Sequence, residues 1–228
     1  MTEALSQGLD TTSLFDEGSW SGTLFPGAGE MTGRMVVRST PRSVVPSGDR
    51  CSEREGAARA ARSARRFVVA NELSAMATAT FARSVSDDFA ATEMELLLRR
   101  CKYARDAFPF LWTLERGSKR GRVHGHLLLP ASLASRVEGQ WPHGHIQVDV
   151  GANDWESLRQ RAGYLSKAFD TPVLGGQRYR RSKGFQPEAV RIDAPSLDGL
   201  VAEAEAQMSA SAILTHRGSV GVAAQWEA

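Results

Sequence analysis

Long apolar runs are absent from this sequence of 228 residues, and cysteine is scarce. No segment approaches the roughly 18 consecutive apolar residues of a membrane-spanning helix, so we do not expect a membrane protein. Residues 1–18 lack the basic start and apolar core of a secretory signal, and we therefore expect a cytoplasmic protein. The two cysteines, Cys51 and Cys101, are too few for a disulfide framework or for a zinc site made of cysteine alone.

The remaining composition is that of an ordinary globular chain. Hydrophobic residues make up 42% of the sequence and charged residues 24%, which argues against a fully disordered or collagen-like protein. The length favours one domain with tails, or one large domain.

The net charge of +2 conceals an uneven distribution of charged residues. Residues 1–56 carry 5 basic and 8 acidic residues, and residues 196–228 carry 1 and 4, so each end has a net charge of −3. The 22 basic and 14 acidic residues of 57–195 leave this central part at +8. Such asymmetry is typical of a protein that binds a polyanion, although a well-solvated arginine-rich surface would give the same count.

Turn-forming and apolar residues divide the chain into three predicted parts. Residues 1–56 are rich in Gly, Ser, Thr and Pro and lack a sustained apolar period, so we predict a mobile N-terminal tail. Residues 57–195 are the predicted folded domain. Residues 196–228 are a predicted C-terminal tail, with a helix over 197–208 and weak order beyond it.

The central part predicts the order helix, strand, helix, strand, strand, helix, strand, helix. The second helix is expected to begin at Asp87 and the last at Asp154. Their apolar stripes, which we expect to be buried, are Phe89, Met94, Leu97 and Leu98 in the former, and Leu158, Ala162, Leu165 and Phe169 in the latter. This order favours an α+β fold: a central antiparallel sheet with helices packed on one face, the other face being left open to a ligand.

A predicted β-hairpin carries the first candidate site. FLWTLE and RVHGHLLL are strand-like runs around a polar turn, and a hairpin centred near Lys119 pairs Glu115 with His124 and Thr113 with His126. Alternate residues of a strand share a face, so these four side chains lie together, with Trp112, Leu114, Val123 and Leu127 on the other face. Two imidazoles and a carboxylate can bind a divalent cation and leave coordination positions open for a substrate oxygen.

A second His-Gly-His tripeptide, His143 to His145, follows Trp141-Pro142 and is an alternative metal site. Its place at a turn entering a strand favours His145 alone for the strand face. A turn histidine or a substrate contact are the other interpretations of this tripeptide.

The last predicted helix carries a candidate nucleophile. Tyr164 and Lys167 are three residues apart and so share a helix face. A tyrosine hydroxyl can form a covalent intermediate but is a weak nucleophile at its ordinary pKa near 10. A metal ion on the phosphate and a nearby cation such as Lys167 would assist it at neutral pH. An exposed tyrosine beside a solvated lysine is the plainer interpretation.

Together these residues resemble the HUH endonucleases, and more narrowly the rolling-circle replication initiators of plasmids and some phages. VHGHLLLP resembles their histidine motif, WPHGHIQVDV followed by AGYLSKAF resembles their strand and nucleophile helix, AMATATFA their first strand motif, and RYRRSKGF the basic segment that follows. The resemblance covers about residues 60–190.

The resemblance implies a nicking reaction on single-stranded origin DNA. Tyr164 would attack a phosphodiester and leave a 5′-phosphotyrosine bond and a free 3′-OH. His124, His126 and Glu115 would bind Mg²⁺ or Mn²⁺, and Lys167 would be accessory. The sequence departs from the family at Gly125, where a bulky hydrophobic residue is usual, and its single helix tyrosine points to the single-tyrosine type.

The chain also lacks the Gly-x-x-x-x-Gly-Lys-Ser/Thr loop of a helicase, so unwinding would require a host helicase. Basic side chains would neutralise DNA phosphates, which supplies affinity without sequence choice. The candidates are Arg59, Arg62, Arg66, Arg178, Arg180, Arg181 and Lys183. Tyr179 could stack on a base, although core packing explains it as well.

Three other functions fit parts of the pattern. A nucleic-acid-binding regulator without activity would need only the basic surface. A metal-dependent phosphohydrolase would use water at the two histidine pairs, although two-histidine phosphodiesterases want Thr or Ser in place of each second histidine. A relaxase or single-strand transposase would be another HUH enzyme, but relaxases usually have the tyrosine before the histidines.

Overall fold

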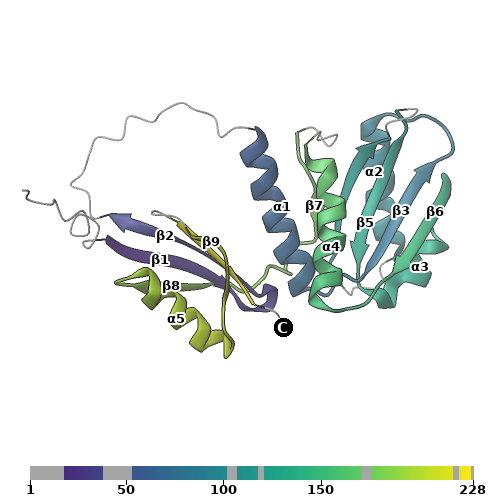
Figure 1. The fold of residues 1–228 in the computed structure, drawn as a ribbon. Helices are drawn as coiled ribbons and strands as arrows, with labels where there is room; N and C mark the ends of the chain where they lie inside the picture. The colour runs from purple at the N-terminus through teal and green to yellow at the C-terminus, as the bar shows by residue number, and fades with distance from the viewer. Residues whose placement is uncertain are drawn as a thin grey trace, which may run out of the picture. The chain divides into compact units, whose positions relative to one another are not determined.

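The structure is a computed structural model, and it describes residues 18–37, 53–101, 107–117, 121–170, 176–217 and 221–226. The chain divides into two compact units: residues 48–188 form one, and residues 1–47 together with 189–227 form the other. Each unit has its own five-stranded antiparallel sheet, so the architecture is α+β, as predicted (Figure 1). No helix among the described residues is long and apolar enough to cross a membrane.

The unit of residues 48–188 has the predicted order of elements. Its sheet runs β6-β3-β5-β4-β7 (Figure 1). The elements are α1 (Glu53–Ala70), β3 (Ala75–Phe81), α2 (Asp87–Cys101), β4 (Leu111–Arg116), β5 (Val123–Leu129), α3 (Ala134–Glu138) after a 3-10 turn (Ala131–Leu133), β6 (Gly144–Val150), α4 (Trp155–Ser166) before a 3-10 turn (Lys167–Phe169), and β7 (Arg180–Arg181).

One face of this sheet is covered by α2 and α3. Strand β3 alternates buried and partly buried residues, and its alanines and Phe81 point into this core. Trp112 and Leu127 of the hairpin join it, which confirms the predicted inner face. In the α2 stripe, Met94, Leu97 and Leu98 are buried as expected, but Phe89 is 43% exposed, contrary to the prediction. Phe89 lies in the first turn of α2, so the core beneath the helix reaches only the later turns.

The other face is divided along its strands into an apolar and a polar half. Met76, Leu111 and Leu128 form a second core with α1 and α4. Leu158, Ala162, Leu165 and Phe169 of the α4 region are all buried there, as predicted. Further along the same strands this face carries threonine, histidine and glutamate instead. The two helices therefore cover one half of the face, and the second half is available to a ligand.

The second unit is built from both sides of the chain. Its strand order is β8-β1-β2-β10-β9. The elements are β1 (Gly18–Phe25), a 3-10 turn (Pro26–Ala28), β2 (Glu30–Val37), β8 (Val190–Ala194), α5 (Leu197–Met208), β9 (Ile213–Arg217) and β10 (Gly221–Gln225). Leu200 of α5 packs on Gly22 and Gly33, where a Cβ would come within 3.1 Å and 2.6 Å of its methyl groups. The glycines thus let the helix approach the sheet.

This unit differs from the predicted tails. Helix α5 matches the predicted 197–208, but residues 18–37 form two strands, and residues 213–217 and 221–225 form two more. Residues 190–194 belong to this sheet and not to the domain predicted to end at 195. The reason is long-range pairing, since β1 pairs with β8 and β2 with β10. The rest of the predicted N-terminal tail, residues 1–17 and 38–52, lies outside the described residues.

Candidate functional site

Two rows of polar side chains cross the uncovered half of the sheet of residues 48–188. Glu115 pairs with His124 and Thr113 with His126, which confirms the predicted hairpin register. Strand β3 lies on the other side of β5, where Thr80 faces His124 and Thr78 faces His126. Strand β6 completes the rows with His145 and Gln147.

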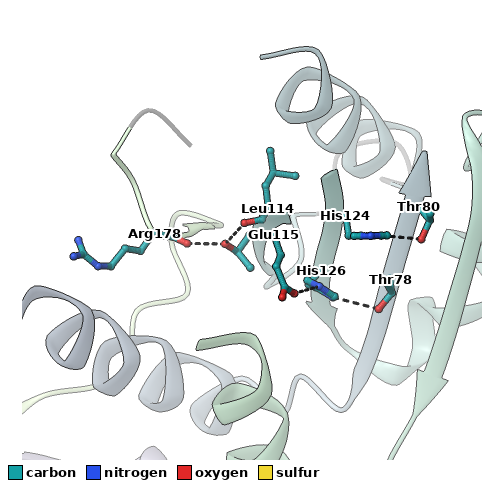
Figure 2. Close-up of polar contacts among 8 residues, drawn as sticks. Thr78, Thr80, Leu114, Glu115, His124, His126 and Arg178 are labelled. Atoms are coloured by element: carbon teal, nitrogen blue, oxygen red, sulfur yellow. Dashed lines mark hydrogen bonds and ion pairs between the residues drawn. The ribbon is translucent and has the colours of Figure 1, made fainter. Parts of the chain in front are cut away.

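Both histidines of the hairpin are oriented by threonines of β3. Thr78 Oγ1 lies 3.3 Å from Nδ1 of His126, and Thr80 Oγ1 lies 3.1 Å from Nδ1 of His124 (Figure 2). With Nδ1 held in this way, each ring presents Nε2 as its second nitrogen. On His126 this atom shares a 2.8 Å hydrogen bond with Oε2 of Glu115 (Figure 2).

Sequence reasoning missed the two threonines. Their signal was present in AMATATFA, because the alanines of this run alternate with Met76, Thr78 and Thr80. Buried alanines on one face place the threonines on the other. Partners of this kind fix ring orientation and tautomer around metal-binding histidines.

Burial sets the charge of His126. This side chain is 6% exposed, and its burial lowers the pKa of the imidazole below its ordinary value, against the opposing hydrogen bond and charge of Glu115. The neutral ring, favoured at neutral pH, is the form that binds metal ions.

The donor set has the chemistry that a divalent cation requires. Two imidazole nitrogens and a carboxylate oxygen suit ions such as Mn²⁺, and the Glu115 and His126 donors already lie at hydrogen-bonding distance. Among the described residues, however, no three His, Cys, Asp or Glu side chains converge as a set that could hold a metal ion. Glu115 turns toward His126, while Nε2 of His124 lies beside Gly117, 2.9 Å from where a Cβ would stand.

Helix α4 brings Tyr164 to this site. The helix is capped by Asp154, whose carboxylate accepts a 2.9 Å hydrogen bond from the Ser157 amide. Arg161 ties it to β6 by a 2.7 Å ion pair with Asp149. The Tyr164 ring stands edge-on to His126, with centroids 5.8 Å apart, and is 47% exposed.

Lys167 lies one turn beyond, with Nζ 5.2 Å from the centre of the Tyr164 ring. Predicted residues from the hairpin and from the helix are thus brought together, with Tyr164 open to solvent on one side and next to His126 on the other.

The second tripeptide does not form a histidine pair. His143 stacks on Phe81 at 6.0 Å, and its Nε2 lies 2.7 Å from Oε2 of Glu93 on α2. His145 lies in the row of Thr80, on the opposite face. Gly144 between them has a φ of 145°, a conformation that favours glycine. The two side chains therefore serve different surroundings.

Met94 explains the glycine of the first tripeptide. A Cβ on Gly125 would overlap Sδ of Met94 and lie 2.9 Å from its Cε. Met94 is fully buried, so its side chain occupies the space that a larger residue at 125 would need. The departure from the family at this position is accommodated by packing from α2.

The predicted DNA-contacting side chains fall into two groups. The first is on the surface: Arg59 and Arg62 of α1 and Lys183 are exposed, and Arg66 is partly exposed. This group is placed where solvent, or a polyanion, can reach it.

The second group is engaged within the unit of residues 48–188. Arg178 donates to the Glu53 carbonyl at 3.0 Å. The remaining contacts are an ion pair of Arg180 with Glu95, Arg180 over the Trp112 ring at 5.6 Å, Arg181 over the Phe67 ring at 5.3 Å, and Tyr179 stacked on Phe169 at 5.2 Å. For Tyr179 the structure favours core packing over base stacking.

Comparison with protein families links this site to DNA replication. The model of a family of replication-associated proteins, described by its member ORF2, matches residues 74–171, a segment that runs from β3 through α4 and holds the hairpin histidines and Tyr164. No curated protein and no solved structure matches the chain. The similarity supports a replication-initiator role and DNA as the partner.

Proposed function

We propose that this protein initiates rolling-circle replication by nicking single-stranded origin DNA with Tyr164. The observation that carries the proposal is the position of the Tyr164 ring, 5.8 Å from the ring of His126, whose Nε2 contacts Glu115. A nucleophile, two oriented imidazoles and a carboxylate thus lie together inside the segment that is similar to replication-associated proteins.

The reaction is a transesterification at one phosphodiester. The phenolic oxygen of Tyr164 forms a bond to phosphorus, and the bond from phosphorus to the 3′ oxygen breaks. The phenolic proton passes to solvent, and the leaving 3′ oxygen takes up a proton. The products are a 5′-phosphotyrosine linkage and a free 3′-OH, from which a polymerase can extend.

His124, His126 and Glu115 would hold the divalent cation, Mg²⁺ or Mn²⁺. When bound, this cation would polarise the scissile phosphate. Thr78 and Thr80 keep the imidazoles in position through Nδ1. The exposure of Tyr164 allows a single strand to approach it from solvent.

Cationic side chains complete the proposed site. Lys167, beside the Tyr164 ring, is placed to stabilise negative charge on the phosphate during attack. Arg59, Arg62 and Lys183 are exposed and can bind the strand through its phosphates. Separation of the duplex would be the task of a host helicase.

The test is covalent adduct formation. A pool of single-stranded oligonucleotides of random sequence, labelled at the 3′ end, is incubated with the protein and Mn²⁺ and resolved on denaturing gels. The 3′ label stays with the phosphotyrosine product, so the wild type should carry labelled DNA, and a chelator should prevent this. Tyr164→Phe should abolish the adduct while preserving the ring beside His126.

Tyr179→Phe is the matched control, since this ring is stacked on Phe169 and should keep full adduct formation. An adduct that survives in Tyr164→Phe would show that another residue is the nucleophile. Cleavage without any adduct would favour a hydrolase that uses water. Binding of the pool without cleavage under either metal would favour a regulator.

A further inference from the structure

A pocket of about 570 Å³ lies at one end of strands β3 and β6. It is lined by Phe81, Arg83, Val85, Phe89, Pro142 and His143, together with backbone at Ala82 and Gly144. Apolar surface dominates the lining. The proposed nicking reaction uses none of these side chains.

Aromatic rings form the wall of the pocket. The His143 ring stacks on Phe81 and meets Phe89 edge-on, with centroids 5.5 Å apart. Trp141 supports His143 from a third side at 5.4 Å. Phe81 is buried in the core, but Phe89 remains 43% exposed, which is costly for a phenylalanine unless something covers it.

The pocket adjoins the row of side chains around His124. Phe81 directly follows Thr80, which binds His124, and Gly144 directly precedes His145. Phe81 and Gly144 are themselves paired across β3 and β6. A strand of DNA whose phosphate lies at the histidines therefore needs to pass the sheet edge by only one residue position to reach the pocket.

The charges around the mouth favour an anionic chain. Arg83 lines the pocket and is exposed. The nearby carboxylates are engaged: Asp87 forms a 2.5 Å ion pair with Arg116, and Glu93 lies between His143 and Arg100. An aromatic wall with a cation at its edge is the arrangement that binds a base by stacking and its phosphate by charge.

From these observations we infer that the pocket receives a nucleobase of the single-stranded DNA, from a nucleotide next to the scissile phosphate, stacked on Phe89. The inference rests on the proposed function in one respect, namely that the histidine row faces DNA. The pocket would hold the strand in register during attack by Tyr164, without taking part in the chemistry.

Two measurements test the pocket in a Tyr164→Phe background, in which the strand stays intact. The first uses oligo(dT) with one thymidine replaced by 5-iododeoxyuridine, which forms crosslinks to contacting aromatic residues under near-ultraviolet light. Mass spectrometry should find the adduct on the peptide with Phe89 or with His143. The second measures binding of labelled oligo(dT) by fluorescence anisotropy at fixed salt.

Phe89→Leu removes the ring but keeps an apolar side chain, and should weaken binding by roughly 5- to 100-fold, as expected for one lost base stack. Phe89→Tyr keeps the ring and should bind within about twofold of the parent. Val150→Ala is the matched control, because Val150 is exposed at the opposite end of β6. Circular dichroism of each variant verifies the fold.

Crosslinks that map only elsewhere, or unchanged binding in folded Phe89→Leu, would overturn the inference and leave an apolar protein segment as the occupant to test. Failure of the proposed function has a different signature. In that case the wild type forms no adduct with Mn²⁺, even where oligo(dT) still crosslinks at Phe89.

Discussion

Gly125 and Met94 share one space between β5 and α2, and this makes a sharp prediction about the histidine motif. A Cβ on Gly125 would lie 2.9 Å from Cε and 3.1 Å from Cγ of Met94, and would overlap Sδ. Met94 is fully buried within the core that α2 forms with the sheet. We expect Gly125→Ala to cost about 1–3 kcal/mol of unfolding free energy, as is usual for overpacking a core.

The partner substitution has the opposite defect. Met94→Ala removes most of a buried side chain and leaves a cavity, which should cost about 2–5 kcal/mol. In the double variant the new methyl at 125 extends into that cavity, and the clash is absent. The two changes should therefore be coupled by about 1–3 kcal/mol in favour of the double variant.

Urea unfolding followed by circular dichroism measures the four free energies of this cycle. Gly139→Ala combined with Met94→Ala is the matched control, because a Cβ at Gly139 meets nothing within 4 Å. That control pair should be additive within about 0.5 kcal/mol. Adduct formation is a second measurement: Gly125→Ala should slow it by displacing the flanking histidines, and the double variant should recover.

Two results would refute this reasoning. Additive free energies for Gly125→Ala and Met94→Ala would mean that the two residues do not compete for space. A neutral effect of Gly125→Ala alone would mean that α2 moves away freely, and the glycine would then need another explanation.

Three further predictions concern other parts of the chain. Thr80→Val removes the hydroxyl held 3.1 Å from His124 Nδ1 and should slow adduct formation about 10- to 100-fold with little change in unfolding; an unaltered rate would contradict an orienting role. Hydrogen bonds from the Ser157 hydroxyl and amide lower the pKa of Asp154, so its stabilisation of α4 is present above the ordinary carboxyl pKa and is lost as pH falls through the lowered value. The advantage of wild type over Asp154→Ala in thermal melts should accordingly shrink between pH 7 and about pH 3, and a constant difference would exclude this linkage. Burial raises the pKa of the Cys101 thiol, against the charges of two nearby arginines, so with the other cysteine changed to serine an aromatic disulfide reagent should react only as the protein unfolds; immediate labelling would contradict the burial.

Local pattern was sufficient where the partners are close in sequence. The polar turn around Lys119 and the alternation on both sides of it determine the register that pairs Glu115 with His124. Asp154 marks the start of α4, and the apolar stripe that follows sets which side is buried. Tyr164 could therefore be placed on the helix from sequence alone, although its contact with His126 could not.

Other features depend on contacts that local pattern does not reveal. The strands at 18–37 are interrupted by glycines that only make sense once Leu200 packs on them. Phe89 looks like a core residue by spacing, but the core ends before the first turn of α2. The two histidines on either side of Gly144 look equivalent in sequence, and the positive φ of that glycine separates them.

The interleaved construction of the second unit has a consequence for synthesis on the ribosome. Strands β1 and β2 emerge first, but their lateral partners β8 and β10 follow only after all of residues 48–188. The segment with the histidines and Tyr164 is continuous and can reach its native contacts as it is translated, whereas the hairpin of β1 and β2 must wait with both edges unpaired. High contact order and exposed strand edges make such an intermediate slow to fold and prone to intermolecular pairing. Deleting residues from either side would therefore trap the first hairpin in that state, while a circular permutant that joins β10 to β1 would let the sheet close without delay.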